Sequence, residues 1–169
     1  MIVPDFQSNC ADCVGLCCVA LAFDHSDSFA FDKPSGEACH NLDDNFRCKI
    51  HSSLKDAGFS GCVAYDCLGA GQRVTAIYDG VSWQKNREYL TPMMDSFRAM
   101  RKVQELLQLL TTAGKLPLPD HVQQTLTRHI ATLMPLEGWT PQNLTTFERG
   151  PIPKHIQSFM RDLRDYVLP

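Results

Sequence analysis

Cysteine is the residue type in this sequence with the clearest chemical potential, because four of the eight cysteines fall within the stretch CADCVGLCCVAL at residues 10–21. The other four follow soon after, and none occurs beyond Cys67. Thiols grouped in this way can ligate a metal, pair as disulfides or form a redox-active site. The eight candidate metal ligands are Cys10, Cys13, Cys17, Cys18, Cys39, Cys48, Cys62 and Cys67.

The spacing of the first cysteines suits a shared metal centre. If residues 10–18 are helical, Cys10, Cys13 and Cys17 stand at positions i, i+3 and i+7, and their thiols share one face. Cys18 then points about 100° away around the helix axis. The adjacent pair is therefore expected to serve two different sites, unless one thiol is a buried spectator. Three thiolates with a fourth from elsewhere satisfy either tetrahedral zinc or a cubane iron–sulfur cluster.

The later cysteines bring the number of thiols to two sets of four. Their spacing is C-x8-C-x13-C-x4-C, and it does not reveal which thiols act together. His51 follows Cys48 at zinc-knuckle spacing, and His25 and His40 lie in the same half of the chain. Each histidine is either a ligand or an ordinary surface or hydrogen-bonded side chain.

No familiar catalytic motif accompanies the cysteines. The sequence contains no glycine-rich phosphate loop and no recognisable Ser-His-Asp spacing. The glycines of DCLGAGQ, residues 66–72, lack dinucleotide-fingerprint spacing and are expected to form a tight turn. Tyr65 and Asp66 either hydrogen-bond the metal ligands or belong to a solvated loop. The sequence leaves enzymatic activity open, favours its absence and assigns no catalytic residue.

Composition and charge narrow the class of protein. Apolar residues make up 44% and charged residues 21% of the chain, which is typical of a folded globular protein. The formal net charge is −3 and the basic residues form no block, so we expect no nucleic-acid partner. No stretch reaches the roughly 20 apolar residues of a membrane helix, and the start of the chain lacks signal-peptide features. A cytoplasmic location without membrane association is therefore expected.

The elements that must position the cysteines change in character near residue 70. Residues 1–70 have irregular periodicity and many Asp, Gly and Ser residues, which indicates loops and short helices held by something other than a large core. In residues 72–84, the pair Asp79-Gly80 lies between two β-prone runs and predicts a short hairpin.

Three amphipathic helices are predicted beyond the hairpin. The first spans residues 92–113, with Thr91 as a candidate cap and Gly114 as its terminator. The second spans residues 120–134, and the third follows Pro153. Helix faces of this width are usually buried, so we expect the apolar stripes to form the core.

These elements predict a mainly α fold. Residues 1–70 would be an irregular, cysteine-rich, metal-bound region. Residues 71–169 would hold the short β-hairpin and a bundle of about three helices. We expect the two regions to pack as one compact unit.

Four segments in fixed order carry a resemblance to a known family. They are C-x2-C-x3-C-C at residues 10–18, GEACHNL, FRCKIH and GCVAYDC. Over residues 10–67 this order is similar to the YkgJ-like cysteine-cluster proteins, which are described as zinc- or iron-chelating. The resemblance implies that all eight cysteines chelate metal, and a frequent Tyr at the position of His51 argues against His51 as an obligatory ligand. The stretch HSSLKDAGFSGC departs from the Arg-Pro segment common in that family.

Two further resemblances extend the alternatives. Residues 29–72 and the helix after Trp83 resemble the amino-terminal region of certain bacterial pentapeptide-repeat proteins, although this chain lacks the repeats. Some flagellin lysine methylases contain a similar cysteine cluster, which implies an iron–sulfur or accessory component of a modification enzyme as one option.

The sequence therefore favours a metal-binding protein that holds zinc or an iron–sulfur cluster, with a protein partner as a further option. One alternative is a thiol–disulfide redox protein that uses Cys10 and Cys13, but the βαβ context of such sites is missing. Another is a disulfide-stapled secreted domain, which the absent signal peptide disfavours.

Overall fold

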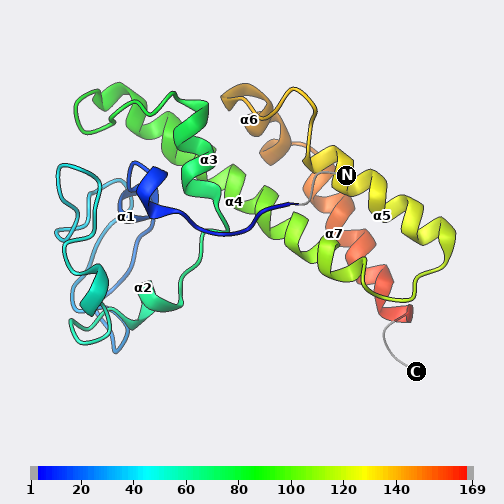
Figure 1. Ribbon diagram of the computed structural model, residues 1–169, viewed down its shortest axis with the longest axis horizontal. Helices are drawn as coiled ribbons and strands as arrows, with labels where there is room; N and C mark the ends of the chain where they lie inside the picture. Colours follow the sequence, from blue (N-terminus) through cyan, green and yellow to red (C-terminus); the bar gives the residue numbers. More distant parts are fainter. Residues whose placement is uncertain (1–3, 167–169) are drawn as a thin grey trace.

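The computed structural model describes residues 4–166 and is mainly helical (Figure 1). Within these residues it contains seven α-helices, four short 3-10 helices and no β-strand. The α-helices are α1 Leu16–Ala20, α2 Ser60–Ala64, α3 Ala70–Ile77, α4 Leu90–Ala113, α5 Asp120–Leu133, α6 Pro141–Arg149 and α7 Ile152–Asp162. The 3-10 helices are η1 Cys10–Asp12, η2 His51–Ser53, η3 Arg87–Tyr89 and η4 Leu163–Tyr166. The prediction of a mainly α fold is confirmed.

Helix α4 is the spine of the molecule (Figure 1). The cysteine-rich loops and α6 both contact its amino-terminal half, and α5 and α7 pack toward its other end. Its apolar side chains at helical spacing are buried, including Met93, Phe97 and Leu110. The predicted helix starts two residues too late, since Tyr89 rather than Thr91 is the N-cap, but Gly114 is the C-cap as expected.

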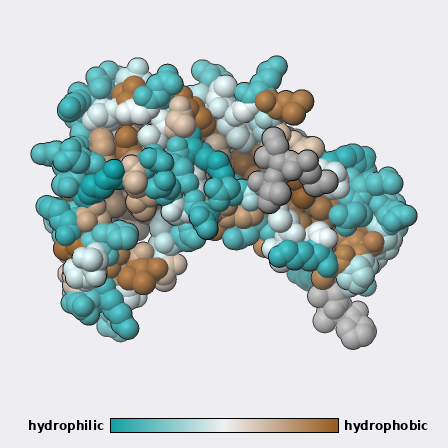
Figure 2. Space-filling model, viewed as in Figure 1, coloured by the Kyte–Doolittle hydropathy of each residue, from teal (hydrophilic) through white to brown (hydrophobic). Residues whose placement is uncertain are grey.

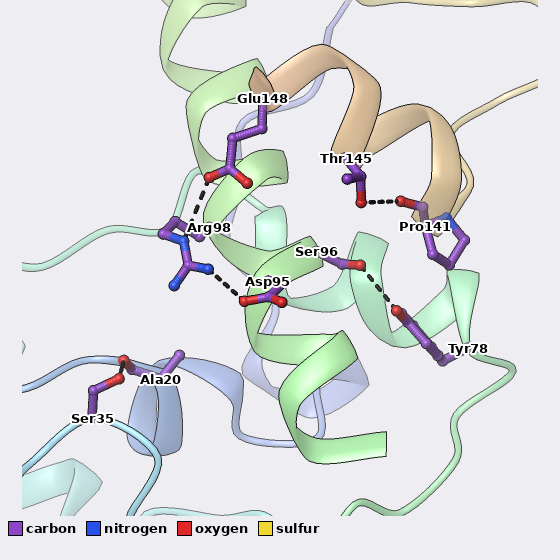
Figure 3. Close-up of polar contacts among 9 residues, drawn as sticks. All are labelled: Ala20, Ser35, Tyr78, Asp95, Ser96, Arg98, Pro141, Thr145 and Glu148. Atoms are coloured by element: carbon purple, nitrogen blue, oxygen red, sulfur yellow. Dashed lines mark hydrogen bonds and ion pairs between the residues drawn. The ribbon is translucent and has the colours of Figure 1, made fainter. Parts of the chain in front are cut away.

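The helices that complete the bundle agree with the prediction except for one addition. Helices α5 and α7 occupy the predicted segments, and their inward faces are buried. Helix α6 was not predicted. Thr140 and Asn143 form a capping box at its start, in which each side chain bonds the other residue's backbone N–H. Arg98 of α4 contacts Glu148 of α6 at 3.4 Å (Figure 3).

The predicted β-hairpin at residues 72–84 is wrong, because most of its first half belongs to helix α3. Its β-prone residues also repeat at helical spacing, and this places Val74 and Thr75 on a buried face. The turn itself is real: Asp79 and Gly80 have φ angles of 51° and 71°. The Tyr78 hydroxyl then lies 3.0 Å from the Ser96 hydroxyl of α4 and fixes the end of α3 (Figure 3).

The front of the chain contributes little to the hydrophobic core. In residues 21–58, all of which the structure describes, Lys33 is the one buried residue. Three isolated β-bridges order this segment, among them Phe23 with Lys33 and Leu42 with Cys48. Val14 and Leu16, by contrast, lie in the same buried cluster as the helices. A single core therefore holds the bundle and the first cysteines, and the intervening loops reach it through partly buried side chains such as Leu42 and Phe46.

The outer surface is largely hydrophilic on the face seen in Figure 2, with small separate apolar areas. Among the described residues, no helix combines the length and the apolar character that crossing a membrane demands.

Candidate metal centre

All eight cysteines line one cavity of about 640 Å³. They reach it from five separate parts of the chain: the η1 region, α1, the loops at residues 33–50, α2 and the turn before α3. Every one of them is a free thiol. The structure therefore brings together the whole set that the sequence singles out: Cys10, Cys13, Cys17, Cys18, Cys39, Cys48, Cys62 and Cys67.

The expected continuous helix over residues 10–18 is wrong. The chain makes one 3-10 turn, extends at Cys13, and reverses at Gly15 before α1 begins. Gly15 has a φ of 66°, and an added Cβ would lie 3.0 Å from Leu42 Cδ1. Both the left-handed backbone and this close approach favour glycine. The bend carries Cys13 and Cys17 to the cavity without a shared helix face.

The adjacent thiols of Cys17 and Cys18 lie closer together than the helix argument suggests. Their sulfurs are 3.9 Å apart. Cys17 lines both the large cavity and a smaller pocket beside it, whereas Cys18 lines the large cavity alone. Helix α1 thus presents two successive thiols to the same cavity.

The smaller pocket, of about 20 Å³, has four cysteines in its wall. Helix α3 closes it at Gly71, where an added Cβ would lie 2.7 Å from Cys13 Sγ and 3.8 Å from Cys67 Sγ. Both sulfurs therefore approach the same point on the helix, which only glycine leaves open. Its thiol lining consists of Cys10, Cys13, Cys17 and Cys67.

The loop that carries Cys10 and Cys13 is held through its backbone. Val14 N–H donates to Thr75 Oγ1 at 3.1 Å, and Trp83 Nε1–H donates to the Val14 carbonyl at 2.6 Å. The guanidinium of Arg47 donates to the carbonyl oxygens of Cys10 and Ala11. The groups of Val14 are buried and costly to leave unpaired, so its two bonds fix the backbone next to Cys13, while Arg47 adds bonds at the exposed carbonyls before it.

Cys67 has a polar neighbour within hydrogen-bonding distance. The Ser8 hydroxyl lies 3.1 Å from Cys67 Sγ and 2.5 Å from Asp66 Oδ1, and Asp66 Oδ1 also accepts from Leu68 N–H at 2.8 Å. The carboxylate of Asp66 therefore shapes the turn that presents Cys67, and it bonds Ser8 and Leu68 rather than a cysteine sulfur.

The loop at residues 33–39 caps the end of α1. Cys39 N–H donates to the Cys18 carbonyl at 2.9 Å, and Gly36 N–H donates to the Val19 carbonyl at 2.8 Å. Ser35 Oγ–H donates to the Ala20 carbonyl at 2.7 Å (Figure 3). These are carbonyls that a helix end cannot satisfy internally, so the cap ties Cys39 to Cys18.

Lys33 is a buried cation beside this cap. Its ammonium donates to the carbonyl oxygens of Glu37 at 3.0 Å, Pro34 at 3.1 Å and Val19 at 3.5 Å. Burial lowers the pKa of Lys33, and negative charge on the nearby Cys39 and Cys18 thiols acts in the opposite direction. A positive charge therefore lies near these two cysteines.

Burial also governs the thiols themselves. It raises the pKa of Cys62 from its ordinary value of 9.0 to about 11, and it raises the pKa of Cys10, Cys13 and Cys48. The pKa of Cys17 is raised above all by its contact with Cys18. In the metal-free protein at neutral pH these thiols are protonated, and metal binding would have to displace the protons.

The three candidate histidines lie in different places. His51 lines the cavity. His40 stacks on Phe31 with ring centroids 4.7 Å apart, and His25 is exposed. Neither of these two belongs to the cavity wall. Among residues 4–166, no group of three or more Cys, His, Asp or Glu side chains is arranged to hold a metal ion directly.

The cavity also contains residues that sequence reasoning missed. Arg101 of α4 donates to the Tyr65 hydroxyl at 3.2 Å, lies 4.9 Å over its ring and pairs with Glu105. Aromatic and aliphatic side chains form the rest of the wall, which would limit the access of water. The apolar members include Leu21, Phe23, Phe29, Phe46, Leu54 and Phe59.

The chemistry of these donors fits a thiolate-bound metal group. Thiolate sulfur ligates both zinc and iron–sulfur clusters, and eight such donors around one hollow exceed what a structural core needs. A metal group held here would be bound by cysteine sulfur and surrounded by aromatic rings.

Comparison with known proteins shows similarity to a protein about twice as long. The chain is 37% identical over 145 residues to a protein of Bacillus subtilis (strain 168) named "Uncharacterized protein YybG". The match covers 85% of this chain and 52% of that protein, so the chain spans about half the length of its relative. No protein-family model matches the sequence, and no solved structure matches it.

Proposed function

We propose that this protein binds metal through its eight cysteines and holds zinc or an iron–sulfur cluster. The observation that supports this most directly is that cysteines from five parts of the chain all line one cavity. Thiols placed only for packing would have no reason to converge. We further propose that the chain is related to the YkgJ-like cysteine-cluster proteins, on the resemblance of its segments in residues 10–67.

The size of the cavity favours the iron–sulfur alternative. A zinc ion holds its four sulfurs about 2.3 Å from the metal and needs little space beyond them. A cubane cluster contains iron and sulfide atoms of its own and therefore fills a hollow between more widely separated thiols. A cavity of about 640 Å³ with an aromatic wall suits the second arrangement better. An iron–sulfur cluster would supply electron transfer or a structural link at this site.

The residues around the thiols would orient and shield such a group. Arg47 and Trp83 hold the backbone next to Cys10 and Cys13, and Ser8 lies within hydrogen-bonding distance of Cys67. Lys33 supplies positive charge near Cys18 and Cys39. A thiolate-ligated group is anionic, so this charge would stabilise it.

The redox-thiol alternative has less support. A reactive thiol needs a lowered pKa, but burial raises the pKa of both Cys10 and Cys13. A reducing compartment such as the cytoplasm would keep the eight thiols available for metal, and we propose that location. We propose no nucleic-acid or membrane partner.

Anaerobic purification with metal and sulfide analysis tests the proposal. Iron with matching acid-labile sulfide and absorption at about 400 nm would identify a cluster, whereas colourless protein with stoichiometric zinc would identify zinc. Protein purified from metal-replete cells that contains neither, and takes up neither on reconstitution, contradicts metal binding. Disulfide reductase activity that disappears in Cys10→Ser would then support the redox alternative.

A further inference from the structure

We propose that the cavity holds two separate four-cysteine centres, and that the adjacent residues of helix α1 serve one each. This inference rests on the proposed metal binding. The first centre consists of Cys10, Cys13, Cys17 and Cys67. The second centre consists of Cys18, Cys39, Cys48 and Cys62.

The first centre lines a small pocket of its own, of about 20 Å³. Of the eight cysteines, four line the small pocket against α3, with Gly71 and Phe97 opposite them. Cys13 and Cys67 both approach Gly71. Four thiolates are the full ligand set of a tetrahedral zinc ion, and a pocket of about 20 Å³ suits such an ion better than a cubane cluster.

The second centre takes the four remaining cysteines, which line the large cavity without reaching the small pocket. Their segments are joined by backbone bonds. Cys39 N–H donates to the Cys18 carbonyl. Leu42 joins the segments of Cys39 and Cys48, because its N–H donates to the Cys39 carbonyl and it forms a β-bridge with Cys48. Cys62, in helix α2, is the fourth cysteine of this centre.

Packing against the core separates three cysteines of the first centre from the four of the second. Cys13, Cys17 and Cys67 are partly buried against the hydrophobic cluster that includes Val74 and Phe97. Among the residues that the structure describes, none of the four cysteines of the second centre packs on that cluster. The first centre is therefore attached to the helical core through three of its four cysteines, whereas the described cysteines of the second centre make no such contact.

Helix α1 is the element that the two centres share. Cys17 is part of the small pocket and Cys18 is not, although the residues are consecutive and their sulfurs are 3.9 Å apart. A substitution at one of the pair should therefore affect a different centre from a substitution at the other. This pair gives the sharpest test, because the two variants change adjacent residues of the same helix.

The test measures metal per chain in single and double Cys→Ser variants of the full protein, purified anaerobically. Cys17→Ser and Cys18→Ser should each retain about half of the wild-type metal. Adding Cys13→Ser to Cys17→Ser should cause little further loss, because both remove the first centre. Adding Cys39→Ser to Cys17→Ser should remove nearly all metal, because each centre then loses a ligand. Val63→Ser, at an exposed position next to Cys62, is the control and should retain the full amount.

Native mass spectrometry of the wild-type protein during metal loading provides a measurement that needs no variant. Two centres predict a half-loaded species between the metal-free and the fully loaded protein. Full loading in one step, or loss of all metal from every single variant with helix content unchanged by circular dichroism, would contradict two centres while metal binding itself stands. Wild-type protein that binds no metal would instead refute the proposed function.

Discussion

The indole Nε1–H of Trp83 donates to the carbonyl oxygen of Val14 at 2.6 Å, which ties the segment before α4 to the residue that follows Cys13. Both residues are buried, with Trp83 1% exposed. The bond is a direct link between the helical half and the cysteine loop, and it acts on the backbone rather than on a thiol.

Trp83→Phe should lower the free energy of unfolding by about 1–3 kcal/mol, because it leaves the buried Val14 carbonyl without its donor. Urea denaturation measures this loss. The variant should also lose metal faster to a competing chelator. Trp139→Phe is the matched control, since Trp139 Nε1–H donates to the Leu133 carbonyl away from the cavity. It should reduce stability without changing the rate of metal loss, and equal rates of loss in the two variants would contradict the assignment.

Gly71→Ala should reduce the metal content to about half, because the new methyl group would lie 2.7 Å from Cys13 Sγ and displace the first set of thiols. Metal analysis after anaerobic purification checks the result. Gly114→Ala, whose Cβ would meet no atom closer than 3.5 Å, should retain the wild-type amount. Full metal content in Gly71→Ala would show that the contact with α3 is unimportant.

Lys33→Met should destabilise the protein by about 1–3 kcal/mol, because the Glu37 and Pro34 carbonyls lose their donor beside α1. The loss of positive charge near Cys18 and Cys39 should also weaken retention of the second centre. Equilibrium unfolding and chelator competition measure the two effects. Lys55→Met removes an exposed lysine and serves as the control. Unchanged metal retention would indicate that Lys33 acts only as a helix cap.

Metal removal should loosen residues 21–58 far more than α4 and α5. That segment has one buried residue, whereas the helices share a continuous apolar core. Hydrogen exchange followed by mass spectrometry should show faster exchange in peptides from residues 21–58 after chelation, with α5 peptides as an internal reference. Equal protection before and after chelation would contradict a structural role for the metal.

The metal-free protein should become less stable at alkaline pH. Burial raises the pKa of Cys62 from 9.0 in the unfolded chain to about 11 in the folded protein, so the fold favours the protonated thiol. This stabilisation is fully present below pH 9 and disappears as the pH rises through 11. The difference in free energy of unfolding between metal-free wild type and Cys62→Ser should therefore narrow over this range. Urea titrations at these pH values measure the difference between the two proteins. If that difference widens instead, the prediction is contradicted.

Much of the helical half follows from the sequence because its apolar residues repeat every three or four positions along α4, α5 and α7. Helix α6 was not predicted, because its apolar stripe is short and its strongest signal is the capping box at Thr140. The hairpin at Asp79-Gly80 failed because Val74 and Thr75 suit a strand by type but pack as a helix face. In that case the tertiary contacts with α4 outweighed the local preference.

The cysteines themselves could be selected from the sequence, but their arrangement could not. Grouping in the first 67 residues indicates a shared purpose, and the structure places all eight around one cavity. The route to that arrangement depends on the reversal at Gly15 and on the loop that caps α1, neither of which has a periodic signal. The contributions of Arg47 and Arg101 come from contacts across 36 or more positions in the chain, which no local pattern reveals.

The near absence of buried side chains between residues 21 and 58 has a consequence for biosynthesis. This stretch leaves the ribosome well before α4, the element against which the first cysteines pack. Under the proposed metal binding, a newly made chain would carry eight free thiols until metal reaches it. Metal delivery would then compete with thiol oxidation, and the yield of matured protein would depend on how quickly the cell supplies metal.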